Sequence, residues 1–370
     1  MVDEVFLSAD PTWETEIGQK GSWGVELYLG TPNSKDNVLT YMTSGAHSWV
    51  LLYKDIPIQG GMPGDGSFSQ DKRTLNVSGP GMLGVFDNRI VRAAGASPST
   101  ITSSDNNYSL AGVSSRRVLS ELVSRSLADS ASGAGLPFDT TDGASETGST
   151  ARSFAAWDFN TVLKKMNDET DAVGGCEFIV RPYLYFVSGA PYIGWKLALG
   201  SPLLGDASLA AVWEFGAAFG NIDVDYNLSI PRPHRVWSKG SGDGGSAVVG
   251  YAENSAALQA AGVIYSDYVD TVHNDVGVKT TLDGYASGIL SDRSQPLETW
   301  NAEVRIDGKN SRGAQVSPEL GGWAEGDKPL LRITDHPVIP DGSYRRRIVG
   351  MSNGSGPGLV KLKIQPEPSA

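Results

Sequence analysis

Short segments in which apolar and polar residues alternate recur along most of the chain. The segment ETWNAEVRID shows the pattern clearly, because Trp300, Ala302, Val304 and Ile306 fall on one face of an extended chain. Stretches rich in glycine, proline and asparagine, such as TPNSKDN, separate these segments. The pattern predicts many short β-strands joined by turns, which is typical of small antiparallel barrels and sandwiches.

Two segments in the middle of the chain have helical periodicity instead. The first is predicted to begin near Ser114 or Ser115, either of which is a good N-cap. Its apolar stripe consists of Val118, Leu119, Leu122, Val123 and Leu127. The second is predicted to be capped by Asp158 and to end at Gly174-Gly175. Its apolar face consists of Phe159, Val162, Leu163, Met166 and Val173.

Together these patterns predict a mainly β chain with an α+β insert. Residues 1–95 are expected to form a first small β-barrel domain, and residues 96–200 a domain of two helices and a β-hairpin. Residues 201–370 are expected to form a second barrel, which a short helical piece near 280–290 interrupts. Its predicted strands include 222–229, 235–239, 248–253 and 263–269. Residues 130–153, rich in serine, threonine and glycine, are expected to form an exposed loop.

The net charge and the apolar content of the chain limit the classes of partner that it can bind. The 370 residues carry a net charge of −12, which disfavours general binding to DNA or anionic lipid. The dense basic cluster Arg345-Arg346-Arg347 alternates into a strand, so we expect it on a solvated face with an inter-subunit ion pair. The acidic start of the chain does not follow the order of a secretory signal, and no apolar stretch reaches the ~18 residues of a membrane span. We therefore expect a protein that is made in the cytoplasm and has no membrane span.

Gly240, Gly242 and Gly245 satisfy G-x-G-x-x-G, the spacing of a dinucleotide-binding turn. That turn requires a helix directly after the glycines, because helix N-terminal amides hold the phosphates. The residues that follow are β-branched, aromatic and glycine, and the acidic residue expected about 20 positions on has only Asp267 and Asp270 as late candidates. We predict a β-hairpin rather than a nucleotide site.

Other candidate chemistry is sparse. Cys176 is the only cysteine, so it cannot form an internal disulfide or a cysteine-rich metal site, and we expect it to be a small buried residue. Asp223 and Asp225 share one face of a predicted strand and could serve a glycosidase or hold calcium, but a pair of carboxylates is weak evidence on an acidic chain. No zinc-type spacing links the four histidines, His47, His234, His273 and His336. We expect His273 and His336 to be loop or surface residues.

The nine tryptophans lie mostly in apolar β-like runs, which favours packing over ligand stacking. They are Trp13, Trp23, Trp49, Trp157, Trp195, Trp213, Trp237, Trp300 and Trp323. We predict no catalytic residue, no metal site and no cofactor.

The order of these parts resembles the tail-hub, or minor tail, proteins of long-tailed phages, particularly those of actinobacteria. The opening WGVELYLGTPNSKDNVLTYMTSGAHSWVLLYKDIP resembles the first hub barrel. RRVLSELVSRSLAD and WDFNTVLKKMNDETDAVGGCEFIVRPYL resemble the helix–loop–helix–strand insert. HRVWSKGSGDGGSAVVGYAEN resembles the glycine-rich hairpin, with His234 where asparagine is commoner, and the segments from GDKPLLRITD to GLVKLKI resemble the closing barrel strands.

The resemblance implies a structural protein of the virion, assembled in the host cytoplasm and placed at the tail tip. In such hubs three chains with two tube-type barrel domains each form a ring that closes the tail tube. The implied partners are a distal tail protein, a tape measure protein and other minor tail or fibre proteins, with DNA passing through the ring at ejection. An acidic lumen would repel the phosphate backbone.

Two alternatives remain open at this stage. The chain could be a distal-tail-like or receptor-binding β-protein that binds cell-wall glycan through exposed tryptophan and aspartate side chains, with Trp323 and Trp195 as the candidate tryptophans. It could instead be a wall-degrading hydrolase built around Asp223 and Asp225 or His273, which we consider the weakest of the three.

Overall fold

The structure is a computed structural model of the whole chain. It describes residues 10–29, 42, 47–93, 95, 98–128, 136–172, 174–205, 211–215, 222–227, 233–259, 265–293, 297–309, 313–315 and 318–365.

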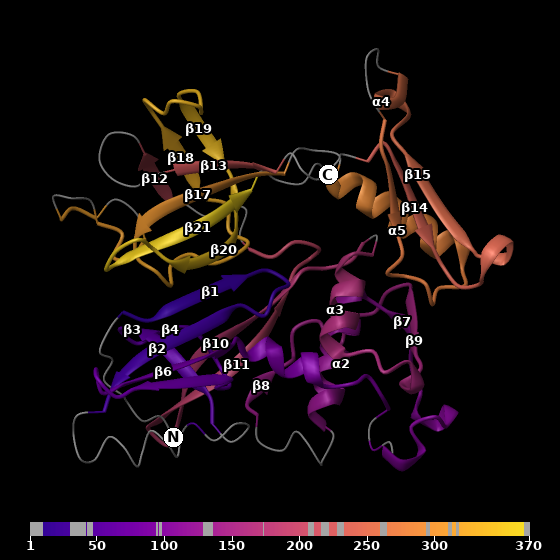
Figure 1. Cartoon of the computed structure of the whole chain (residues 1–370), viewed down its shortest axis with the longest axis horizontal. Coiled ribbons are helices and arrows are strands. Elements are labelled where there is room, and N and C mark those ends of the chain that lie inside the picture. The colour runs from indigo at the N-terminus through magenta and orange to yellow at the C-terminus, as the bar shows by residue number, and fades with distance from the viewer. Residues whose placement is uncertain are drawn as a thin grey trace.

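One eight-stranded sheet joins the two ends of the chain (Figure 1). Every neighbouring pair of its strands is antiparallel. In spatial order the strands are β13 (Ile222–Asn227), β17 (Leu297–Arg305), β21 (Leu359–Gln365), β20 (Arg347–Asn353), β1 (Thr12–Glu16), β2 (Ser22–Tyr28), β6 (Thr74–Pro80) and β5 (Asp65–Ser69). The sheet is open, and no closed barrel is present in the described part of the chain.

The two halves of this sheet repeat one topology. In the first module the chain runs β1, β2, β5, β6, and the spatial order is β1-β2-β6-β5. In the second module it runs β13, β17, β20, β21, and the spatial order is β13-β17-β21-β20. Since all pairings are antiparallel, corresponding strands also run in the same direction. The modules meet head to tail, because β20, third strand of the second module, pairs with β1, first strand of the first.

A small sheet supplements each module between its second and third strands in the sequence. The first module adds the hairpin β3 (Trp49–Tyr53) and β4 (Ile56–Gly61). The second adds β18 (Leu330–Ile333) and β19 (Gly342–Arg345), with β12 (Val212–Phe215) parallel to β18.

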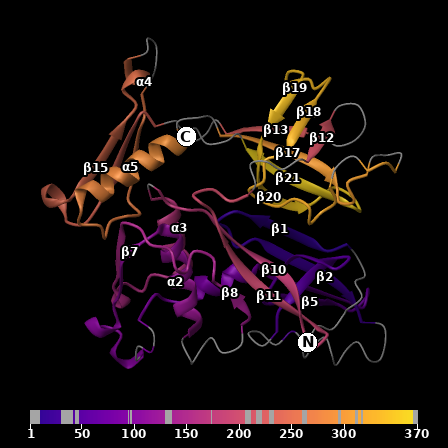
Figure 2. The same cartoon turned by 180° about the vertical axis from the view of Figure 1, so that it is seen from behind.

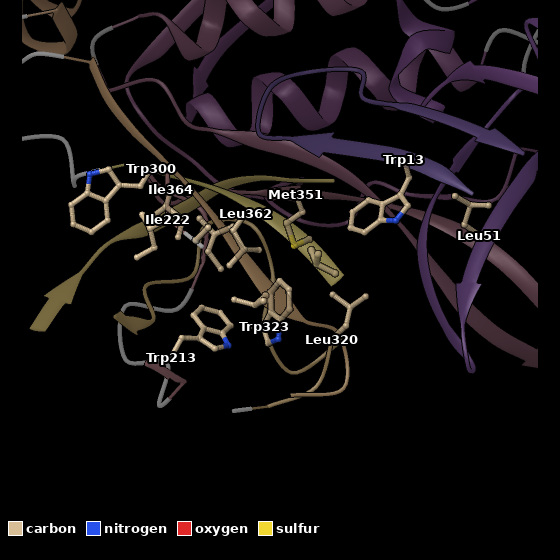
Figure 3. Packing of buried hydrophobic residues seen from close by; sticks show 14 of the residues in the cluster. Trp13, Leu51, Trp213, Ile222, Trp300, Leu320, Trp323, Met351, Leu362 and Ile364 are labelled. Carbon is tan, nitrogen blue, oxygen red and sulfur yellow. The ribbon is translucent and has the colours of Figure 1, made fainter. Parts of the chain in front are cut away.

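A single apolar core packs on one face of the large sheet and spans both modules (Figure 3). Alternation produces it: in β2, for example, Trp23, Val25 and Leu27 are buried. Trp213 and Trp323 meet edge to face at 5.4 Å between ring centroids. Burying such aromatic surface contributes on the order of 25 cal/mol per Å², so this shared core holds the two modules together.

The insert between the modules has a core of its own, centred on two helices. Helix α2 (Ser115–Ala128) begins as predicted, with the Ser114 hydroxyl accepting a hydrogen bond from the Arg117 amide at 3.1 Å. Helix α3 (Val162–Thr170) is capped by Thr161 rather than by Asp158. The prediction failed because Asp158 ends a separate 3₁₀ turn, η4 (Ala156–Asp158), after which Phe159 has φ 51° and is exposed. Val173 of the predicted face lies outside the described residues.

Two strands follow α3 as predicted: β10 (Phe178–Val187) and β11 (Ala190–Leu199) form a long hairpin. The remaining elements of this region are β7 (Tyr108–Val113), β8 (Phe138–Asp139), β9 (Thr150–Phe154) and the 3₁₀ turns η1 (Met82–Asn88), η2 (Pro98–Thr100) and η3 (Ser104–Asn106).

The predicted loop 130–153 is only partly a loop. Residues 130–135 lie outside the described part, but the rest contains β8 and the start of β9. Arg116 of α2 forms ion pairs with Asp142 and Glu146, which fixes this segment to the helix. The serine- and threonine-rich composition of the segment gave no sign that Asp142 and Glu146 form ion pairs with the helix.

A third unit projects beside the insert (Figure 2). It contains β14 (Arg235–Lys239), η5 (Gly244–Ser246), β15 (Val249–Glu253), α4 (Ser255–Gln259), β16 (Asp267–Asp270) and α5 (Lys279–Arg293). Its three-stranded sheet has the order β15-β14-β16, and α5 packs on β14 and β15. The helical piece predicted near 280–290 is therefore α5. Of the predicted strands 222–229 and 263–269, residues 228–229 and 263–264 are not described.

The mainly β fold with an α+β insert that the sequence predicts is confirmed. Among the described residues, no helix is both long enough and apolar enough to span a membrane.

Candidate assembly site

The large sheet has one polar face and two free edges, which together make the candidate assembly site. The polar face lies opposite the apolar core and carries alternate residues of each strand. Its carboxylates outnumber its basic groups: Glu14, Glu16, Glu26, Asp65, Asp223, Asp225 and Glu303 lie there with Arg305, Lys361 and Lys363. Lys363 and Glu16 form an ion pair of 2.6 Å across the junction of the modules. The face is thus acidic and free of large apolar side chains near this junction.

The free edges are β5 and β13, which within the described residues pair only with β6 and β17. By the repeat, β5 corresponds to β20 and β13 corresponds to β1. Those two counterparts are joined inside the chain by the pairs Glu14↔Ser352, Thr15↔Met351 and Glu16↔Gly350. By the repeat, the two free edges are therefore equivalent to the two strands that pair with each other inside the chain.

Phe68 marks the edge of β5. It pairs with Leu75 and so points to the core side of the sheet, but its side chain is 58% exposed. No described strand follows β5 to cover it, whereas the core-side residues of the inner strands are buried. An exposed apolar residue beside an open row of backbone donors and acceptors is typical of an edge that receives another strand.

The internal junction shows what stabilises such an edge pairing. Glu325 is 2% exposed and accepts hydrogen bonds from the Thr15 hydroxyl of β1 and, at 3.2 Å, from Nε of Arg181 in β10. Sequence reasoning missed Glu325, since a glutamate in a glycine-rich loop does not stand out from its neighbours in the sequence.

The basic cluster is only partly the solvated face that the sequence predicts, because Arg345 is exposed but Arg347 is not. Arg347 is buried and pairs with Glu177 within the chain, because it begins β20 beside the insert. Arg346 stacks on Trp300 at 4.8 Å, and Arg345 donates to the Lys328 carbonyl oxygen at 3.1 Å. The expected inter-subunit role is replaced, for Arg347, by an internal one.

The glycine motif forms the predicted hairpin. Gly245 lies in the 3₁₀ turn η5, and strand β15 rather than a helix follows it in the chain. A Cβ on Gly240 would lie 2.2 Å from the Val276 carbonyl oxygen, and Gly242 has φ +98°. These two glycines are required by the geometry of the turn.

Asp223 and Asp225 do share one face of β13, as predicted. Both are exposed, and Asp225 accepts a hydrogen bond from the Asn301 amide. They form part of the polar face and are open to solvent. Within the described ranges no group of three or more His, Cys, Asp or Glu residues could hold a metal ion.

The histidines lie apart. His273 lies in a turn, as the loop prediction allows, but it is buried at 4% exposure: its Nδ1 lies 2.6 Å from Oδ2 of Asp270, and its ring stacks on Tyr285 at 3.6 Å. The pair spans three residues, so the chain turn after β16 brings the side chains together where strand alternation would separate them. His336 and His234 accept hydrogen bonds from nearby backbone amides.

Buried packing accounts for Cys176 and most tryptophans. Burial raises the pKa of the Cys176 thiol to about 12, so it is not a nucleophile at neutral pH. Trp195 and Trp323, the candidates for glycan stacking, are 1% and 3% exposed and cannot reach a ligand. The tryptophans with exposed side chains are Trp157 and Trp237, which are 41% and 39% exposed.

Comparison with known proteins shows the fold. No protein-family model matches the chain, and no curated protein matches its sequence. The tail protein from Neisseria meningitidis MC58 superposes with a TM-score of 0.53 and 12% identity over 96% of this chain and 91% of that one. The 43 kDa tail protein of prophage MuSo2 from Shewanella oneidensis gives a TM-score of 0.55 and 10% identity over 97% and 94%. The chain has the fold of these tail proteins, and its predicted likeness to phage tail proteins is confirmed at the level of the fold.

Proposed function

We propose that the protein is a structural hub at the tip of a phage tail, in which three chains close into a ring. Each chain supplies two modules, so the ring has six. The observation that carries the proposal is the repeat, in which β5 and β13 are the counterparts of two strands that already pair. A unit that joins head to tail through such edges forms a closed ring when the rotation per step divides a full turn.

The direction of the strands supports closure. Strand β20 runs antiparallel to β1, and β5 and β13 run in the same directions as β20 and β1. Strand β5 of one chain therefore meets β13 of the next in the antiparallel sense that the internal junction uses. Repeating the step adds modules around one axis.

The ring also accounts for the polar face. The core and the small sheets cover the other face, so the polar face is the one available to line a lumen. Its excess of carboxylates repels the phosphates of DNA and lets the duplex pass without binding. In this assembly the chain is a non-enzymatic virion component, and its neighbours are a distal tail protein, a tape measure protein and fibre proteins.

We retain the domain division predicted from the sequence as part of this proposal. Residues 1–95 and 201–370 supply the two tube-type domains and 96–200 supply the insert. Among the described residues, only the first and last of these ranges contribute strands to the shared sheet.

Sedimentation equilibrium tests the ring. At high protein concentration we expect a species of three 39.2 kDa chains. Phe68→Glu places a charge in the proposed β5–β13 contact and is expected to weaken the trimer at least tenfold while leaving the monomer folded. Phe159→Glu, at an equally exposed phenylalanine of the insert, is the matched control and leaves the trimer intact. A wild-type protein that stays monomeric throughout, or two variants with the same effect, contradicts the proposal.

A further inference from the structure

The sheet of the third unit has one covered and one open face. On the covered face Val236 and Ser238 are fully buried, and Leu282 of α5 packs there. On the open face Trp237 is 39% exposed and Val269 is 56% exposed. A large aromatic residue left in solvent on an otherwise well-packed sheet indicates a contact surface.

Register places the apolar side chains of the open face in one row. Trp237 pairs with Tyr251 on one side and with Val269 on the other. The rings of Trp237 and Tyr251 lie 4.4 Å apart, tilted by 45°. Neighbouring strands are about 4.8 Å apart, so the row forms a continuous platform that runs across the strands, with its two rings inclined to each other.

A row of charged groups lies directly beside the platform. Arg235 pairs in register with Glu253 and with Asp267, so a guanidinium stands between two carboxylates. Its Nε lies 3.7 Å from Oε2 of Glu253, and it is 5.1 Å from the ring of Tyr265. The Tyr251 hydroxyl donates a hydrogen bond to Glu253, which links the two rows.

We propose that this open face, formed by Tyr251, Trp237 and Val269 with Glu253, Arg235 and Asp267, binds a neutral oligosaccharide. A hexopyranose presents a face of C–H groups, which packs on the electron-rich face of an indole or phenol ring. Its hydroxyls at the ring edge both donate and accept hydrogen bonds. The neighbouring row supplies both partners, since carboxylates accept and the guanidinium donates.

Charge separates this ligand from the other polymers that stack on aromatic rings. Single-stranded nucleic acid also stacks on Trp and Tyr, but it requires a groove of positive charge for its backbone. Here Glu253 and Asp267 flank Arg235, and with Lys239 on the same face of β14 the charges balance, so the face offers no excess of positive charge to phosphate or sulfate groups. A neutral sugar chain is the stacking ligand that this row accommodates.

Binding of oligosaccharides to the full-length protein tests the proposal. The probes are chitotriose and cellotriose, which are neutral and β-linked, with a heparin tetrasaccharide as the anionic comparison, and binding is measured by calorimetry and saturation-transfer NMR. We expect at least one neutral probe to bind and heparin not to bind. Trp237→Ala is expected to weaken binding at least tenfold, and Asp267→Asn, an isosteric change at an exposed carboxylate, several-fold.

Trp157→Ala is the matched control, because Trp157 is exposed to the same degree but belongs to η4 of the insert. It retains full binding. The proposal is overturned if both neutral probes fail to bind, which leaves the face to a protein partner, or if binding survives Trp237→Ala. The trimer measured by sedimentation is independent of this face, so the two proposals fail separately.

Discussion

Arg347 of β20 forms a two-point ion pair with Glu177, which stands immediately before β10 of the insert. Nη1 lies 2.7 Å from Oε1, and Nη2 contacts Oε2. The two side chains are only 4% and 18% exposed. Arg347 also donates to the Leu204 carbonyl oxygen at 3.3 Å, and the Leu204 amide donates to Glu177. This buried pair, joined by two hydrogen bonds, thus fixes the insert to the second module.

Glu177→Gln is expected to destabilise the protein strongly. It leaves the Arg347 charge buried without its counter-ion, which costs roughly 3–5 kcal/mol in comparable sites. Glu214→Gln removes a partner from the exposed pair Arg332–Glu214, whose side chains are 55% and 66% exposed. That control is expected to cost less than about 1 kcal/mol. Urea unfolding followed by tryptophan fluorescence measures both, and equal costs would refute a stabilising role for the buried pair.

Gly205 and Gly326 allow two backbone segments to touch. A Cβ on Gly205 would lie 2.0 Å from the carbonyl carbon of Gly326, and Gly205 has φ +96°. Gly205→Ala therefore combines the cost of a positive φ, about 1 kcal/mol, with a clash that adds about 1–3 kcal/mol. Gly189 has φ +83° and open space around it, so Gly189→Ala carries the cost of the positive φ without the clash. Gly205→Ala should lower the melting temperature clearly more than Gly189→Ala, and similar shifts would show that the segments can separate.

Asp270 gives the third unit a sensitivity to acid. Burial opposes ionisation of this carboxyl, but hydrogen bonds from His273 and from the Val272 amide outweigh it and lower the pKa below the ordinary 3.8. A carboxyl with a lowered folded-state pKa stabilises the protein above its unfolded pKa, and that stabilisation is lost as the pH falls through the folded-state value. Its contribution is therefore complete at neutral pH and declines below about pH 4.

Asp270→Asn is expected to lower stability at pH 7 by about 1–3 kcal/mol, because the His273 ring loses its charged partner. The difference from wild type should shrink as the pH approaches 3. Melting curves between pH 7 and pH 3 provide the measurement. A difference that is constant across this range would mean that the Asp270 carboxylate is not what stabilises the unit.

Cys176 should be chemically silent in the folded protein. Its side chain is 2% exposed, and burial raises the thiol pKa to about 12. Iodoacetamide at pH 8 is expected to label it only after unfolding in urea, because the thiolate is the reactive form. Rapid labelling of the native protein would show that the thiol is accessible after all.

Local sequence patterns correctly predicted the features that depend on interactions between neighbouring residues. Alternation identified the strands around Trp300, and serine at position 114 marked the start of α2. The hairpin at Gly240 followed from the absence of a helical stripe after the glycines. In each case the deciding interaction lies within a few residues.

Interactions between distant residues were not predictable in this way. Pairing of β1 with β20 joins residues more than 330 positions apart, and it turns two expected barrels into one continuous sheet. Arg347 was expected in solvent because its partner, Glu177, lies 170 positions earlier. His273 was expected in a loop or on the surface, and its burial against Asp270 was not predictable because the turn after β16 has no strong sequence signal.

The central claim is that β5 of one chain pairs with β13 of the next, and a disulfide across that edge tests it most directly. Ser67 and Asp223 point to the same polar face of their strands, as does Asp225, and the native Cys176 is buried and does not interfere. Oxidation of Ser67→Cys/Asp223→Cys or Ser67→Cys/Asp225→Cys should yield covalent trimers, whereas Ser67→Cys/Lys361→Cys, with its second cysteine on an inner strand, should not. Covalent trimers from Ser67→Cys/Lys361→Cys, or a failure of all three variants to form covalent trimers, would contradict this pairing.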